Sequence, residues 1–219
     1  MIALPLVAGL VVLGIAIVVA AAKAISQLAA AREDADKNFS TCPVGSPAQT
    51  CPLQGLSETE KADVKQAITD AKSMLEKTKK DIETWDAATQ ARAQKWFGDS
   101  SEATQQKMFD RTNKELDKLN KLTPENFQHV EPGEDSKVYA YVYPNDDTKI
   151  YLGDSFADAP ATGKDSKAGT LIHEISHFDS VGGTKDNAYG TKDSEDLAKT
   201  DSAAAQDNAD SFEYFVEGQ

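Results

Sequence analysis

The sequence predicts an α+β domain that is mostly helical, contains one small β-sheet or hairpin, and follows a hydrophobic N-terminal helix. Three observations predict this class: an uncharged apolar run at the N-terminus, apolar residues at helical spacing over most of the remainder, and one stretch of strict alternation. The chain has 219 residues, of which 40% are hydrophobic, so we expect one core. Its 36 acidic and 23 basic residues give a net charge of -13, which argues against a nucleic-acid partner because such binding depends on Lys and Arg.

Residues 1–22 carry no charged side chain and are predicted to form a transmembrane or signal-anchor helix. About 21 helical residues at about 1.5 Å each cover the roughly 30 Å hydrocarbon core of a bilayer. A cleaved signal peptide and a helix held within a delivery system are the alternatives, since small residues follow at positions 20–24. Lys23 and Arg32 are too few, and too close to acidic residues, to fix the orientation of the helix.

Residues 23–55 are interpreted as a linker, because Pro and Gly interrupt any regular pattern in their second half. Cys42 and Cys51 are the only cysteines of the chain. We interpret them as a disulfide that closes a small loop, which suits an extracytoplasmic compartment; two free thiols in a spacer are the alternative.

Residues 56–219 are predicted to form the globular domain. Ser57-Glu58-Thr59-Glu60 has the form of a capping box, so a helix is expected to begin there and to run to about Ala93. A second amphipathic helix is expected after Trp96-Phe97-Gly98, ending at Thr123-Pro124. Their core stripes are Val64, Ile68, Ala71, Leu75 and Ile82 in the first helix and Met108, Phe109, Leu116 and Leu119 in the second.

The segments 138–143 and 149–152 alternate in strand fashion on either side of a Pro-Asn-Asp-Asp turn, and they predict a β-hairpin. Residues 167–179 return to helical spacing. The C-terminal segment 203–218 is predicted to be one further helix.

His173-Glu174-Ile175-Ser176-His177 is an H-E-x-x-H motif within the predicted helix 167–179. Two histidines four residues apart lie on one helical face and are able to bind one Zn2+, and Glu174 then lies beside the metal's water. A surface helix with two histidines is the alternative, but the chain has only three histidines.

A catalytic zinc needs a third protein ligand, and the extended motif with a third histidine is excluded because Gly183 occupies that position. His129 lies far upstream and is interpreted as a structural or surface residue. A carboxylate is therefore expected. Asp186 is the first acid after the turn at Gly182-Gly183, and Glu195 is its rival.

Gly183-Thr184-Lys185-Asp186-Asn187-Ala188-Tyr189-Gly190 matches the pattern G-T-x-D-x-x-Y-G at every fixed position. Residues 57–219 thereby resemble the aspzincin, or deuterolysin-like, metalloendopeptidases. Several further segments resemble the peptidyl-Lys branch of that family: Trp96-Phe97-Gly98, Tyr139-Ala140-Tyr141-Val142, Ile150-Tyr151-Leu152, Gly169-Thr170-Leu171-Ile172 and Asn208-Ala209-Asp210. The resemblance implies a zincin-like fold and a zinc-dependent endopeptidase with one Zn2+ per chain. It further implies that His173, His177 and Asp186 bind the metal, that Glu174 is the general base, and that Tyr189 polarises the substrate carbonyl.

Asp210 and Glu213 lie three residues apart, hence on one face of the expected C-terminal helix. The resemblance implies that they bind the Lys that follows the scissile bond, so that cleavage occurs on its amino side; two ordinary surface acids are the alternative. The expected partners are Lys-containing proteins or peptides, and a membrane through residues 2–22. An extracytoplasmic location is expected, either anchored or secreted.

The chain departs from the lysine-specific branch in having no cysteine after Cys51, whereas members of that branch typically carry disulfides within the catalytic domain. The combination of a hydrophobic N-terminal segment, a small Cys-containing spacer and a hydrolase domain makes a peptidase delivered as an effector against one protein or cell-wall target an alternative, with a delivery or inhibitor protein as a further partner. A non-catalytic module with a structural zinc is a weaker alternative, because structural sites normally have four protein ligands.

Overall fold

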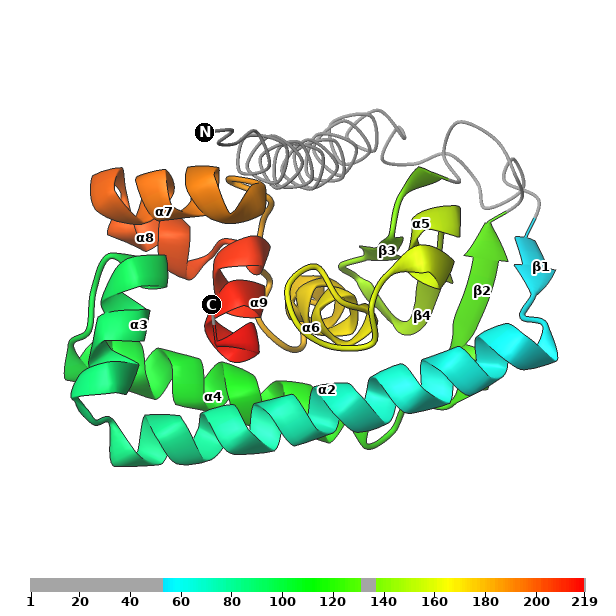
Figure 1. Cartoon of the computed structure of the whole chain (residues 1–219), viewed down its shortest axis with the longest axis horizontal. Helices are drawn as coiled ribbons and strands as arrows, with labels where there is room; N and C mark the ends of the chain where they lie inside the picture. Colours follow the sequence, from blue (N-terminus) through cyan, green and yellow to red (C-terminus); the bar gives the residue numbers. More distant parts are fainter. Residues whose placement is uncertain (1–52, 131–136, 219) are drawn as a thin grey trace, which may run out of the picture.

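The computed structural model describes residues 53–130 and 137–218. In Figure 1 the long helix α2 runs along one side of the domain, the small sheet lies at one end, and α3, α7 and α8 lie at the other, with α6 between them. The described helices are α2 (Glu58–Thr84), α3 (Ala87–Phe97), α4 (Glu102–Leu119), α5 (Asp154–Asp158), α6 (Lys167–His177), α7 (Gly190–Thr200), α8 (Ser202–Gln206) and α9 (Ala209–Glu217), with a 3-10 turn at Pro124–Asn126. The predicted α+β class, mostly helical with a small sheet, is confirmed.

The first predicted helix is in fact two helices. It begins as expected: Ser57 Oγ accepts a hydrogen bond from the amide of Glu60, whose side chain accepts from the amide of Ser57. It ends at Thr84 rather than near Ala93, because Trp85 adopts a left-handed conformation with φ of 45°. Asp86 then caps α3 by accepting a hydrogen bond from the amide of Thr89.

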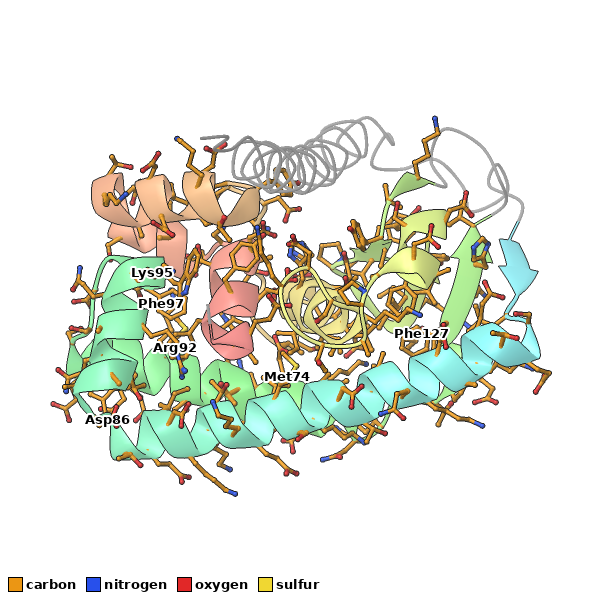
Figure 2. The ribbon with its side chains drawn as sticks, in the orientation of Figure 1. Met74, Asp86, Arg92, Lys95, Phe97 and Phe127 are labelled. Carbon is orange, nitrogen blue, oxygen red and sulfur yellow. The ribbon has the colours of Figure 1, made fainter. Side chains whose placement is uncertain are left out.

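The predicted core stripes lie in one hydrophobic cluster that joins the two ends of the domain. The five apolar positions of the first stripe are all buried, as are Met108 and Leu119 of α4, while Phe109 and Leu116 are partly buried against the cluster. Figure 2 labels Phe127 at the sheet and Phe97 on α3, and both belong to this cluster. Burial of this apolar surface provides the main driving force that holds the helices together.

The sheet has four strands in the order β1-β2-β4-β3. The predicted hairpin is confirmed as β3 (Ala140–Tyr143) and β4 (Asp146–Leu152), which pair antiparallel. Two strands extend it: β2 (Phe127–Val130) pairs parallel with β4, and β1 (Leu53–Gly55), which the sequence places in the linker, pairs antiparallel with β2. Strand β3 is therefore an edge of this sheet, and it faces α6 (Figure 1).

The C-terminal segment also forms two helices, α8 and α9, because the helical conformation is interrupted at Asp207 and Asn208. The backbone there pairs with Lys185 across an isolated parallel bridge. Helix α9 is buried from Ala209 to Val216, and it packs against α6 and α3. The rings of Trp96 and Tyr214 lie 5.1 Å apart, and those of Phe97 and Phe215 lie 5.0 Å apart. This packing holds α9 against α6, the helix that bears the H-E-x-x-H motif.

The predicted N-terminal helix at residues 1–22 and the cysteines Cys42 and Cys51 lie outside the described residues. Within residues 53–130 and 137–218, no helix is both long enough and apolar enough to cross a bilayer.

Candidate active site

Helix α6 carries the H-E-x-x-H motif through the centre of the domain. Its start is capped by Ser166, whose Oγ accepts a hydrogen bond from the amide of Gly169 at 2.9 Å. Every residue from Ala168 to His177 is buried, because α9 and α2 cover the helix on one side and β3 on another. The two histidines are therefore held on a helix whose position is fixed on several sides.

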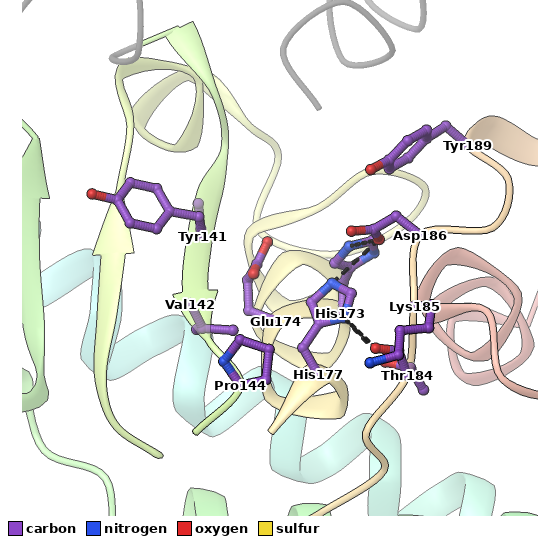
Figure 3. Close-up of a pocket in the computed structure, with 11 residues that line it drawn as sticks. Tyr141, Val142, Pro144, His173, Glu174, His177, Thr184, Lys185, Asp186 and Tyr189 are labelled. Carbon is purple, nitrogen blue, oxygen red and sulfur yellow. Dashed lines mark hydrogen bonds and ion pairs between the residues drawn. The ribbon is translucent and has the colours of Figure 1, made fainter. Parts of the chain in front are cut away.

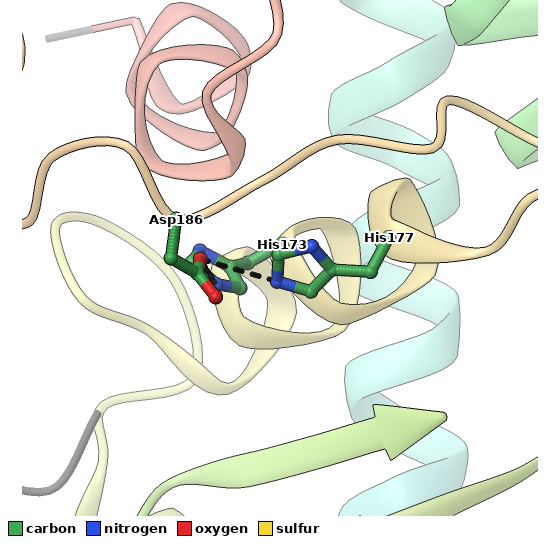
Figure 4. Close-up of side chains that lie close together, drawn as sticks. All are labelled: His173, His177 and Asp186. Atoms are coloured by element: carbon green, nitrogen blue, oxygen red, sulfur yellow. Dashed lines mark ion pairs between the residues drawn. The ribbon is translucent and has the colours of Figure 1, made fainter. Parts of the chain in front are cut away.

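The three predicted ligands meet at one point (Figure 4). Asp186 Oδ1 lies 3.3 Å from His173 Nε2 and 3.2 Å from His177 Nε2. The three ligand atoms all lie within 4.8 Å of one another. Tetrahedral ligands at about 2.0–2.1 Å from one zinc ion are about 3.3–3.4 Å apart, so this spacing fits a single Zn2+. The donor set of two imidazoles and one carboxylate also fits zinc.

Each histidine is oriented through the nitrogen that points away from Asp186. His177 Nδ1 donates a hydrogen bond to the carbonyl oxygen of Thr184 at 3.0 Å. Because a carbonyl oxygen only accepts, Nδ1 carries the proton, and the lone pair is left on Nε2. Such outer contacts fix the tautomer and ring orientation of metal-binding histidines.

The turn that brings Asp186 to the helix is joined to it by Thr184. The amide of Thr184 donates to the carbonyl of Ser176 at 3.2 Å, and its Oγ1 lies 2.6 Å from Ser176 Oγ. Ser176 Oγ in turn donates to the carbonyl of His173 at 2.7 Å. Thr184 and Ser176 are both buried. These bonds connect the third predicted ligand to the helix that bears the first two.

His173 contacts two acids of α9 through its other nitrogen. Its Nδ1 lies 2.9 Å from Asp210 Oδ1 and 3.3 Å from Glu213 Oε2. The contact between His173 Nδ1 and Asp210 Oδ1 does not have the geometry of a hydrogen bond, so it is an ion-pair contact. Asp210 and Glu213 are 1% and 0% exposed, and the structure places them against His173, outside the lining of the cleft described below.

The electrostatics of the site favour an ionised Asp186. Burial opposes its charge, but contacts with His173 and His177 lower its pKa far below the ordinary value. Burial likewise opposes charge on His173, but Asp186, Asp210 and Glu213 raise its pKa well above the ordinary value. The site thus attracts positive charge, which a metal cation supplies when the imidazoles are neutral.

A cleft opens between α6 and the edge strand β3. Glu174 and Tyr189 both line it, and in Figure 3 the Glu174 carboxylate projects beside the histidines while the Tyr189 hydroxyl points over Asp186. Glu174 is 7% exposed. The remaining lining residues are Ala140, Tyr141, Val142, Pro144, His173, His177, Thr184, Lys185 and Asp186.

Two other candidates from the sequence lie elsewhere. His129 is on β2, with its Nε2 3.5 Å from both Glu60 Oε1 and Asp154 Oδ1, which agrees with a structural role. Glu195, the rival third ligand, is on α7 with its Oε1 3.6 Å from Lys95 Nζ. Neither is among the described groups that converge on His173 and His177.

Sequence reasoning missed the roles of Ser176 and Thr184 and the contribution of β3 to the cleft. Thr184 is a fixed position of the G-T-x-D-x-x-Y-G pattern, so the pattern contained a signal for it. The position of β3 depends on tertiary packing, and no local pattern indicates it.

The chain is similar to known zinc peptidases. The aspzincin family described as lysine-specific metallo-endopeptidase matches residues 83–217. An extracellular protease from Aeromonas hydrophila is 37% identical over 161 residues, which are 74% of this chain and 45% of that protein. A peptidyl-Lys metalloendopeptidase from Grifola frondosa is 54% identical over 80 residues, which are 36% of this chain and 23% of that protein. This chain therefore spans less than half of each of these two relatives.

A solved structure agrees with this assignment. The zinc peptidase from Grifola frondosa superposes with a TM-score of 0.66 and 34% identity, over 74% of this chain and 96% of that one. The resemblance to the aspzincin family and to its peptidyl-Lys branch is confirmed. The chain belongs to the aspzincin family of lysine-specific metallo-endopeptidases.

Proposed function

We propose that this chain is a zinc-dependent endopeptidase that hydrolyses peptide bonds, preferentially on the amino side of Lys. One observation carries the proposal: three ligand atoms with 3.2–3.3 Å contacts lie at a cleft that is also lined by a carboxylate and a phenol. His173, His177 and Asp186 would hold one Zn2+. Three protein ligands leave a tetrahedral position open for water or substrate, as hydrolysis requires.

Zinc, when bound, supplies Lewis acidity, which polarises a carbonyl and lowers the pKa of water. The residues of the chain perform the remaining steps. Glu174, at the edge of the cleft, accepts a proton from the attacking water and returns it to the leaving amine. The Tyr189 hydroxyl donates a hydrogen bond to the oxyanion that develops on the scissile carbonyl.

We assign the preference for Lys to the acidic pair on α9, which would bind the Lys side chain of the substrate. Asp210 and Glu213 place two buried carboxylates beside His173. A buried pair of acids repels unless a cation compensates it, and a Lys side chain provides that cation. The relatives from Grifola frondosa, Armillaria mellea and Pleurotus ostreatus are named as peptidyl-Lys metalloendopeptidases, which supports this assignment.

We also propose that the peptidase works outside the cytoplasm. The name of the relative from Aeromonas hydrophila, an extracellular protease, supports this location. The substrates would then be Lys-containing proteins or peptides. The membrane helix at residues 1–22 and the Cys42–Cys51 disulfide stay predictions of the sequence.

Glu174→Gln tests the mechanism. The variant should bind zinc with wild-type stoichiometry, because Glu174 is no ligand, yet its hydrolysis of a Lys-containing fluorogenic peptide should fall by at least about 10²-fold. Glu195→Gln is the matched control, since this acid on α7 contacts Lys95 at the surface. Turnover by E174Q at the wild-type rate would refute the role given to Glu174.

A further inference from the structure

We propose that Arg111 on α4 is a positioning residue, which holds the turn that carries Asp186 in the place where its carboxylate meets the two histidines. The inference rests on the proposed function, because it takes Asp186 as a metal ligand. It goes beyond that function in giving α4 a role in the site, since no lining residue of the cleft comes from this helix. Arg111 acts on the metal only through other residues.

Four basic side chains form a row on one face of α4, at steps of four, three and four residues: Lys107, Arg111, Lys114 and Lys118. Two of them show where this row is directed. Lys107 Nζ lies 2.8 Å from Asp207 Oδ1, at the junction of α8 and α9. Lys114 Nζ donates a hydrogen bond to the carbonyl oxygen of Val181 at 3.2 Å, in the turn after the H-E-x-x-H motif. The row therefore contacts both of these backbone segments.

Arg111 is the buried member of the row, with 4% of its side chain exposed. Its Nη2 lies 3.6 Å from Asp207 Oδ1, and its guanidinium carbon lies 5.1 Å from the centre of the Phe212 ring on α9. Its Nε packs against the turn after the motif, because a Cβ added to Gly182 would lie 3.0 Å from that nitrogen. One planar guanidinium thus contacts the turn, the α8–α9 junction and α9 together.

Both contacted segments lead directly to Asp186. The carbonyl of Asp207 accepts a hydrogen bond from the amide of Lys185 at 2.7 Å, and the carbonyl of Lys185 accepts one from the amide of Ala209 at 3.0 Å. On the other side, Gly182 lies four residues before Asp186 in the same turn. A shift of either segment therefore moves the Asp186 carboxylate, whose Oδ1 lies only 3.2 and 3.3 Å from the histidine nitrogens.

The hydrogen bonding of Arg111 argues against a role in stability alone. Its Nε and Nη1 find no hydrogen-bond partner within the part of the chain that the structure describes. Glu115, one turn further along α4, is 0% exposed, and neither of its carboxylate oxygens has a partner among the described residues. Burying such charges costs free energy, and apolar residues in place of a buried pair are often neutral or stabilising.

The test compares zinc affinity with stability in full-length variants. Competition with a chromogenic chelator gives the zinc affinity of the apo chain, and urea unfolding gives its stability. Arg111→Lys keeps the charge but loses the planar fork that makes three contacts at once. Its zinc affinity should fall by about tenfold, at the lower end of the range for outer groups because Arg111 acts through the backbone. The visible absorption bands of bound Co2+ should also shift, since they depend on ligand geometry.

Arg92→Lys is the matched control. Arg92 on α3 also packs on a phenylalanine of α9, with its guanidinium carbon 4.6 Å from the centre of the Phe215 ring. Its ion pair, however, is with Asp81 on α2, where Nη2 lies 2.9 Å from Oδ2. Arg92→Lys should therefore change stability but leave the zinc affinity within about twofold and the Co2+ bands in place.

Arg111→Met combined with Glu115→Met is the second variant, and it decides the matter if Arg111→Lys does not fold. It removes one charge of each sign, so the net charge of the chain is unchanged and a loss of zinc affinity does not come from net charge. It should be at least as stable as the wild type, because a buried pair is replaced by apolar residues. Its zinc affinity should nevertheless fall by about tenfold.

The proposal is overturned if folded Arg111→Lys binds zinc within about threefold of the wild type, or if Arg92→Lys loses as much zinc affinity as Arg111→Lys. The same threefold limit applies to the double variant if it has to decide. These titrations need no turnover. A wild-type chain that binds zinc but cleaves nothing would refute the proposed function and leave the role of Arg111 open to the same measurements.

Discussion

Replacing Thr184 by Val tests the link between the Asp186 turn and helix α6. Valine keeps the shape of threonine and the carbonyl that accepts from His177 Nδ1 at 3.0 Å. It removes the hydroxyl, which lies 2.6 Å from Ser176 Oγ and 3.3 Å from His177 Nδ1. Thr184 is 1% exposed, so water does not replace these bonds.

The expected cost follows from the two bonds that are lost. A buried neutral hydrogen bond contributes about 1 kcal/mol net, so the free energy of unfolding of the apo chain should fall by about 1–2 kcal/mol. Ser176 keeps its donation to the carbonyl of His173, which limits the loss. Zinc affinity should fall by about tenfold, since His177 loses part of the contact that fixes its ring.

Thr170→Val on the same helix is the matched control. Thr170 is equally buried, but among residues 53–130 and 137–218 its Oγ1 has no hydrogen-bond partner. Removing that hydroxyl should leave stability unchanged or raise it slightly. Urea unfolding followed by tryptophan fluorescence, together with zinc titration, gives both quantities for both variants. If T184V and T170V behaved alike, the hydroxyl chain through Ser176 would have no role in holding the site.

Two further predictions concern stability. Burial, together with the charge of Glu213, raises the pKa of Glu217 from its ordinary value of 4.5 to about 9. Folding therefore takes up a proton between these values, so this group's contribution is complete below about pH 4.5 and is lost as the pH rises to about 9. Glu217→Gln should match the wild type near pH 5 and exceed its stability at pH 9 in urea unfolding, by up to about 6 kcal/mol for the full change in pKa; parallel pH profiles would contradict this. Gly98→Ala should destabilise by at least about 2–3 kcal/mol, because its φ is 66° and its Cβ would lie 1.9 Å from the carbonyl oxygen of Ala198 on α7. Gly163→Ala, at φ 97° with no heavy atom within 4 Å of the added Cβ, should cost only the backbone strain of about 1 kcal/mol, and equal losses would refute the steric argument.

Local patterns account for the features that the sequence predicted correctly. The capping box at Ser57 and the apolar stripe of α2 depend on residues within one or two turns, which a single sequence displays. The two histidines of the motif share a helical face for the same reason, so their meeting could be expected. Asp186 could be expected near the two histidines only because a turn follows the motif and because the sequence resembles known enzymes.

The missed features depend on tertiary packing. No Gly or Pro near Trp85 marks the end of α2, and a left-handed tryptophan is not itself a signal; the one local indication is Asp86, a residue type that caps helix starts. The parallel pairing of β2 with β4 joins segments about 20 residues apart, and no alternation pattern specifies a parallel partner. The contact between Asp210 and His173 likewise joins α9 to α6, so spacing on α9 alone placed Asp210 on the same face as Glu213 but did not identify its partner.

The most direct test of the central claim is mass spectrometry of the peptides that the full-length chain releases from a denatured protein mixture, with and without a zinc chelator and beside E174Q. Zinc-dependent peptidase chemistry predicts cuts on the amino side of Lys that disappear with the chelator and in E174Q. Cuts that persist in either case, or no cuts by the zinc-loaded chain, would contradict it.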